Sequence, residues 1–228
     1  MRNTFDLEED LSSPDSDDGF GYVRASIKGT IYPETSDIFY TTVQKALDSA
    51  QDLLPILINS DGGDLNAMLQ ILDIMEGISP EVLRFCTINC GMAASAAGPI
   101  LASGSPGFRL ALPRSKVMVH DLSMGTFGSY SDVTDALHQA SMDREILFNA
   151  LDTSTSKTPG YWLKQVNSKK ENIWLNSDLA LKEGFIDTVG VPVIRVSSWK
   201  EVEIICHQKP VPVEKPIPAP KSRKTKQA

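Results

Sequence analysis

Short apolar segments alternate with longer amphipathic segments along most of this sequence, and this alternation constrains the fold more than any other feature. Residues 22–29, 53–60 and 81–88 are short and apolar, which is typical of strands. Residues 36–51 and 65–78 space apolar side chains three and four positions apart, which is typical of helices. A strand–helix–strand order predicts a parallel sheet covered by helices, with right-handed crossovers. We therefore predict an α/β fold of stacked βαβ units, with functional groups at the carboxyl ends of strands.

The second half of the sequence continues this pattern and then departs from it. We expect a helix of small residues, two strands and one long amphipathic helix, in that order, over residues 93–104, 108–113, 116–120 and 129–155. Ser131 or Asp132 is expected to cap the long helix. No strand signal follows the helix at once, so we expect it to project from the sheet. Its apolar face then needs a partner surface, which favours an oligomer.

The two ends of the chain differ in composition from its body. Residues 1–20 hold seven acidic side chains against one basic side chain, and the end of the chain is rich in proline and then basic. Such segments do not bury enough apolar surface to fold alone. We predict one folded domain over residues 21–200, a disordered acidic segment over 1–20 and an extended C-terminal segment over 201–228.

Charge and cysteine content exclude several classes of protein. The formal net charge of −7 argues against a dedicated nucleic-acid-binding protein. The three cysteines form no CxxC pair and no even-numbered framework, which indicates the cytoplasm or an equivalent reducing compartment. No stretch has the length and apolar character of a membrane span or signal peptide, so we predict no membrane association.

Three successive predicted strand ends carry groups with chemical potential. Gly62 belongs to a glycine pair after the second strand, Ser95 lies within the small-residue run NCGMAASAAG, and His120 ends the strand KVMVH. Acyl transfer needs a hydroxyl, an imidazole that takes its proton, and backbone N–H groups that bind the oxyanion. Each group also has a plain structural explanation: a simple turn, a core helix packed through its alanines, and a hydrogen-bonded structural histidine.

Several motifs in a fixed order resemble a known family. The segments INSDGG, GMAASAAGPILASG, RLALPRSKVMVH, MGTFGSYSD and WLNSDLALKEGFID follow one another as they do in the proteolytic subunits of the Clp protease. The likeness covers about residues 22–190. It implies a crotonase-like fold, heptameric rings stacked as a tetradecamer around a chamber, and a separate AAA+ unfoldase that feeds unfolded polypeptides into it.

The resemblance also implies roles for individual residues. Ser95 aligns with the nucleophile, His120 with the general base, and Gly62 and Ala96 with the backbone oxyanion donors. The third member of the triad is usually an aspartate, but Asn172 occupies the aligned position. Asparagine can orient the imidazole, as in Cys-His-Asn proteases, but it lacks the charge that stabilises imidazolium. We therefore predict a weaker catalyst, unless Glu171, the neighbouring acid, substitutes.

A second departure from the family lies just before Asn172. Family members often carry an acid–base pair that acts across the contact between rings, whereas this chain has Lys170 followed by Glu171. Swapping both signs preserves complementarity at a symmetric contact, so this pair is expected between rings, together with Gly125. Solvated surface charge is the plain alternative.

These observations favour a serine endopeptidase subunit of a self-compartmentalising protease. Two other functions stay open: a catalytically weak or inactive ring subunit that assembles with active paralogues, which Asn172 favours, and a crotonase-like acyl-CoA enzyme, which would not need the Ser95–His120 pair. The sequence holds no metal-ligand cluster and no G-x-x-x-x-G-K-[ST] loop. We predict no metal and no cofactor, and we expect a separate partner to supply any ATP-driven unfolding.

Overall fold

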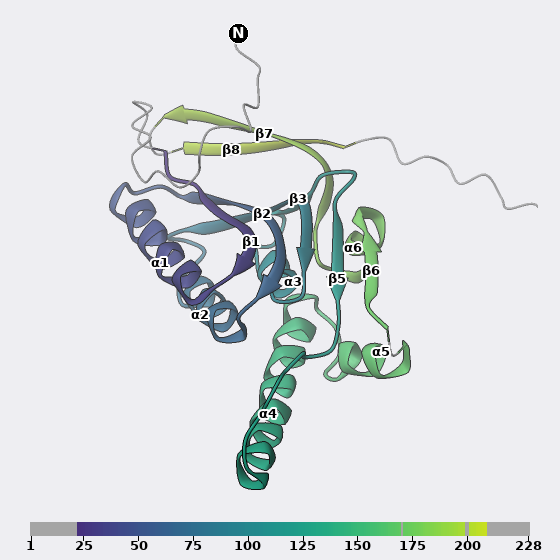
Figure 1. Cartoon of the computed structure of the whole chain (residues 1–228). Coiled ribbons are helices and arrows are strands. Elements are labelled where there is room, and N and C mark those ends of the chain that lie inside the picture. The colour runs from purple at the N-terminus through teal and green to yellow at the C-terminus, as the bar shows by residue number, and fades with distance from the viewer. Residues whose placement is uncertain (1–21, 170, 199–200, 209–228) are drawn as a thin grey trace, which may run out of the picture.

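A computed structural model describes residues 22–169, 171–198 and 201–208, and its centre is a mostly parallel sheet (Figure 1). Within these residues the sheet has eight strands: β1 Ala25–Ile31, β2 Leu53–Gly63, β3 Arg84–Ala94, β4 Arg109–Ala111, β5 Lys116–Val119, β6 Ile173–Asn176, β7 Thr188–Ser198 and β8 Glu201–Gln208. The strand order is β1-β2-β3-β4-β7-β8, and β5 and β6 extend from β3 off this path. Only the β5–β6 and β7–β8 pairs are antiparallel among the described strands. The predicted α/β fold is confirmed.

Helices cover the sheet and also extend beyond it. They are α1 Pro33–Asp48, α2 Leu65–Glu76, α3 Ala97–Ala102, α4 Tyr130–Ser154, α5 Tyr161–Lys169 and α6 Ser177–Glu183. Phe39 and Val43 of α1 and Met68 and Ile71 of α2 are buried in the main core, at the spacing of one helix face. None of the helices in the described ranges combines the length and apolar character needed to cross a membrane.

Helix α4 projects away from the sheet, as predicted (Figure 1). Only its C-terminal part reaches the core, through Phe148 and Leu151. Along the rest of the helix, Leu137, Met142 and Ile146 are exposed in this single chain. Exposed apolar side chains on a projecting helix are typical of an interaction surface.

Two predicted boundaries in this region are wrong. The predicted helix over residues 93–104 begins only at Ala97, because Met92–Ala94 pair with β5 and so continue β3. The cap of α4 is Ser129 rather than Ser131 or Asp132. Ser129 Oγ accepts a hydrogen bond from Asp132 N, and Asp132 Oδ2 accepts one from Ser129 N, which together form a capping box.

The β7–β8 hairpin lies at one edge of the sheet order (Figure 1). The predicted C-terminal segment starts at residue 201, which is also the first residue of β8. Residues 209–228 of that segment and the acidic residues 1–20 lie outside the described residues.

Candidate active site

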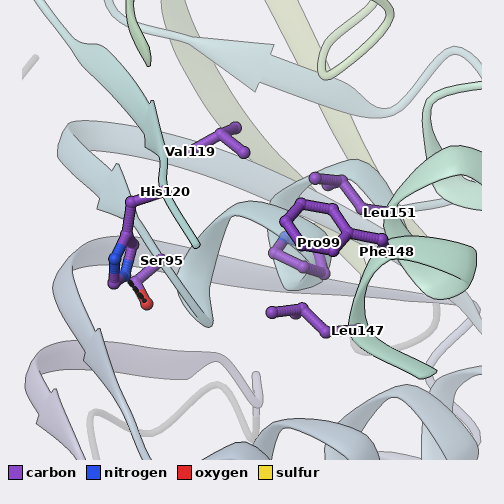
Figure 2. A pocket seen from close by; sticks show the side chains of 7 residues that line it. All are labelled: Ser95, Pro99, Val119, His120, Leu147, Phe148 and Leu151. Carbon is purple, nitrogen blue, oxygen red and sulfur yellow. Dashed lines mark hydrogen bonds between the residues drawn. The ribbon is translucent and has the colours of Figure 1, made fainter. Parts of the chain in front are cut away.

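Ser95 and His120 meet where two neighbouring strands end. Ser95 directly follows β3, His120 directly follows β5, and these strands are parallel, so their carboxyl ends share one edge. The His120 Nε2 and Ser95 Oγ atoms are 2.7 Å apart, and Figure 2 shows the two side chains pointing toward each other. The hydroxyl and the imidazole are thus within the distance of a direct proton transfer.

The backbone of Ser95 adopts a conformation that few non-glycine residues adopt. Its φ angle is +53°, in the left-handed region, at the turn between β3 and α3. Such strained residues cluster at active sites, where surrounding contacts hold them. Here Ser95 N donates to Met118 O on β5 at 2.9 Å, and Gly98 N donates to Ser95 O at 3.0 Å. These two bonds fix the turn that presents the hydroxyl.

Gly62 lies directly behind this turn and leaves no room for a side chain. A Cβ atom at Gly62 would lie 2.6 Å from Ser95 Cβ and 3.0 Å from Ala96 N. Its φ of +96° also requires glycine. The Gly62 N–H donates to Ser60 Oγ at 3.0 Å, and Ser60 Oγ donates to Gly29 O at 2.6 Å. The structure therefore brings Gly62, Ser95 and Ala96 together. The Gly62 N–H points to Ser60 Oγ as its hydrogen-bond acceptor.

A fork in β3 explains how the chain aims Ser95 at β5. Residues Thr87–Asn89 of β3 pair with β4, whereas Met92–Ala94 pair with β5. Asn89 holds both branches: its backbone O accepts from Leu112 N, and its side-chain amide donates to Lys116 O. Bulges of this kind re-aim strands next to active sites.

The partner strand β2 adapts to this fork. The pairing of β2 with β3 jumps from Ile58–Asn89 to Ser60–Ala93, so only Asn59 of β2 stands opposite three residues of β3. Asn59 Oδ1 accepts from Met92 N at 3.2 Å and fills the space beside Gly91, where a Cβ would lie 2.7 Å from that oxygen. The bulge is therefore a well-bonded feature of the fold.

A small pocket of about 20 Å³ opens beside the Ser95–His120 pair (Figure 2). Its remaining lining is apolar and comes from α3, β5 and the C-terminal part of α4: Pro99, Val119, Leu147, Phe148 and Leu151. The sequence analysis assigned no role in the site to the α4 residues. Their only signal was helical apolar spacing, which predicts burial but not proximity to a nucleophile.

Asn172 and His120 flank the last residue pair between β5 and β6. The last β5–β6 pair is Val119 with Ile173, and His120 and Asn172 lie one residue beyond it, outside both strands. Asn172 is exposed, and among the hydrogen bonds of the described residues none joins it to His120. Glu171 is exposed too, and Lys170 lies outside the described residues. Gly125 is exposed, with open space on the side where a Cβ would point.

Asp121 and Arg144 form an ion pair next to His120 that the sequence analysis missed. Arg144 of α4 donates to both carboxylate oxygens of Asp121, with Nε–Oδ1 at 2.6 Å and Nη2–Oδ2 at 2.8 Å. The hydrogen bond from Arg144 is the main cause that lowers the pKa of Asp121, so this carboxylate is charged at neutral pH. No sequence signal joins an acid in a loop to a base 23 positions later on a helix.

Metal-ligating side chains and thiols offer no competing site in the part of the chain that the structure describes. Within the described ranges, no cluster of three or more His, Cys, Asp and Glu side chains has the arrangement of a metal site. The cysteines are free thiols, and burial raises the pKa of Cys86 to about 12. A thiol with so high a pKa is a poor nucleophile. The Ser95–His120 pair is therefore the best candidate for chemistry.

Comparison with known proteins identifies relatives of the chain. The family model described as Clp protease matches residues 30–192. The ATP-dependent Clp protease proteolytic subunit 1 of Corynebacterium efficiens is 34% identical over 148 residues, which are 64% of this chain and 68% of the relative. Subunit 1 of Cutibacterium acnes is 32% identical over 163 residues, 69% of this chain and 73% of the relative. Subunit 2 of Leifsonia xyli is 36% identical over 151 residues, 64% of each chain.

Proposed function

The chain belongs to the Clp protease family, and from this premise we propose that it is a serine endopeptidase subunit in which Ser95 is the nucleophile and His120 the general base. The observation that carries the proposal is the 2.7 Å contact between His120 Nε2 and Ser95 Oγ at the ends of two parallel strands. Membership of the family supports the peptidase activity, and this contact supports the choice of Ser95 and His120 as the residues that carry it.

The reaction follows from the positions of these atoms. His120 Nε2 takes the proton of Ser95 Oγ as the oxygen attacks the scissile carbonyl, and then gives it to the leaving amine. A water molecule, activated by the same imidazole, hydrolyses the acyl-enzyme. The N–H groups of Gly62 and Ala96 are our proposed oxyanion donors, supported by the closeness of both residues to Ser95. The Gly62 N–H must first leave Ser60 Oγ to serve this role.

We assign Asn172 to the third position of the triad. The β5–β6 register supports this assignment, because His120 and Asn172 each lie one residue beyond the last pair, Val119 with Ile173. A side-chain oxygen there can accept the Nδ1–H of the imidazole, but it carries no charge, so we expect a weaker catalyst than one with aspartate.

Self-assembly and an ATPase partner are properties of the family, and the finer arrangement is our proposal. We propose heptameric rings that stack as a tetradecamer through α4, with Gly125, Lys170 and Glu171 at the contact between rings. The exposed apolar side chains of α4 support this arrangement. An AAA+ unfoldase would deliver polypeptide, and we place the assembly in the cytoplasm or an equivalent reducing compartment.

A catalytically inactive ring subunit is the second candidate function. The uncharged, exposed Asn172 favours it, because nothing at that position stabilises an imidazolium ion. The two candidates share the fold and the assembly, and they differ only in the reactivity of Ser95.

Labelling with a fluorophosphonate, which reacts with activated serines, tests the choice. We expect the purified chain to be labelled and to hydrolyse short peptides, and Ser95→Ala to abolish both. Ser168→Ala, a matched change at an exposed serine of α5, should keep both. A wild-type chain that shows neither labelling nor hydrolysis would be a structural subunit.

A further inference from the structure

The segment that carries His120 lacks the support of regular structure. Strand β5 ends at Val119, and residues 120–127 are neither helix nor strand. The sheet therefore fixes the chain only up to the residue before His120. A catalytic imidazole must stay within a fraction of an ångström of its working position, so something else must hold this segment.

Asp121 supplies an anchor one residue after His120. Its carboxylate receives the two bonds from Arg144, and its Oδ1 also accepts from Leu122 N at 2.8 Å. The two-pronged guanidinium–carboxylate geometry fixes orientation as well as distance. His120 thus lies between a strand end on one side and a bidentate ion pair on the other.

Arg144 is itself held in place from two directions. Its Nη2 donates to Asn167 Oδ1 of α5 at 2.7 Å, and its guanidinium lies 5.7 Å from the centre of the Phe148 ring. Phe148 is buried and lines the pocket beside Ser95. The ion pair therefore connects the His120 segment to the same part of α4 that shapes the pocket.

Asn172, at the third position of the triad, gives His120 no comparable support. Asn172 is exposed and makes no hydrogen bond to His120 among those of the described residues, whereas Asp121 and Arg144 are both partly buried. We propose that Asp121 and Arg144 are positioning residues that hold His120 against Ser95, and so carry the orienting task that Asn172 fulfils poorly. This inference rests on the proposed peptidase function.

The chain offers a closely matched ion pair for control. Arg84 Nη2 lies 2.7 Å from Asp52 Oδ2, and its guanidinium lies 4.9 Å from the centre of the Phe108 ring. Exposure is similar as well: the arginine and aspartate side chains are 36% and 48% exposed there, against 29% and 46% for Arg144 and Asp121. Arg84→Met removes a partly exposed ion pair with a single hydrogen bond away from His120, and Arg144→Met removes the two-pronged pair next to it.

Steady-state peptide hydrolysis by the assembled full-length chain tests the proposal. Loss of a positioning contact costs about 10- to 100-fold in rate, so we expect Arg144→Met to lower kcat by that factor and leave KM unchanged. Asp121→Asn should act in the same direction. Arg144→Lys should recover part of the loss, because it keeps the charge but not the fork. Arg84→Met should keep the wild-type kcat.

Thermal unfolding and light scattering complete the experiment. The two Arg→Met variants should keep the wild-type assembly size and stay folded at the assay temperature, so that a kcat loss confined to Arg144→Met separates positioning from unfolding and assembly. Wild-type kcat in Arg144→Met, or an equal kcat loss in Arg84→Met, would overturn the positioning role while leaving the peptidase proposal intact. A wild-type chain without fluorophosphonate labelling would overturn both the peptidase proposal and the positioning role of Asp121 and Arg144.

Discussion

The substitution Asn172→Asp tests whether residue 172 acts on His120. It adds one negative charge just beyond the Val119–Ile173 pair, where His120 follows Val119, and changes almost no volume. If our assignment is right, the new carboxylate stabilises the imidazolium that forms as Ser95 attacks, and kcat rises.

The size of the gain follows from the strand register. If residues 120 and 172 continue the register past the last pair, their side chains lie about 5 Å apart, and two unit charges at about 5 Å gain about 3 kcal/mol at an effective dielectric constant of about 20. Asn172 is exposed, so water and salt screen this attraction. A remaining stabilisation of about 1.4 kcal/mol corresponds to about a tenfold rise in kcat.

Hydrolysis of a short fluorogenic peptide at low and high salt measures this gain. We expect the rise in kcat to shrink as ionic strength increases, because the new charge is exposed. Asn149→Asp, an identical change at an exposed position of α4, should leave kcat unaltered. An Asn172→Asp variant with wild-type kcat at low salt would refute the reasoning that residue 172 faces the imidazole.

Two further predictions concern the turn behind Ser95 and a partly buried ion pair. Gly62→Ala should abolish fluorophosphonate labelling, because its Cβ would lie 2.6 Å from Ser95 Cβ at a φ of +96°. Gly160→Ala is the control: its φ is +82° but the space around it is open, so this variant should keep labelling. Equal labelling of both variants would contradict the close packing of Gly62 against Ser95. Burial raises the pKa of Asp187, but hydrogen bonds and charge from Arg109 lower it further, so its stabilisation is present above about pH 4 and disappears as pH falls through the depressed folded value. We expect Asp187→Asn to lower the free energy of unfolding in urea by about 2 kcal/mol at pH 7 and by progressively less as pH falls through the depressed folded pKa of Asp187; a loss independent of pH would contradict this.

The sequence predicted those parts of the site that depend on strand ends. Ser95 and His120 each follow a strand, Gly62 is the next-to-last residue of β2, and parallel strands bring such ends to one edge. The structure does place these three residues together. Their roles in catalysis stay predictions until the variants above are measured.

Features that depend on side-chain partners across the fold were missed. Ala93 and Ala94 fit a helix as well as a strand, so their pairing with the neighbouring strands β5 and β2 decides that they extend β3. The Asp121–Arg144 pair joins a loop to a helix, and neither periodicity nor motif order predicts such a contact. Local patterns predict elements, whereas contacts between elements need the coordinates.

The fork divides β3 into a first half that builds the sheet with β4 and a second half that leads to Ser95. Gain or loss of one residue between Asn89 and Met92 would leave the earlier half docked on β4, yet it would turn Met92–Ala94 to the opposite face and so redirect the turn that carries Ser95. Evolution can thus silence such a subunit without touching its serine or its histidine, and without dismantling the scaffold. If a relative keeps both residues but does not hydrolyse peptides, the residues between those equivalent to Asn89 and Met92 are the place to look for an insertion or deletion.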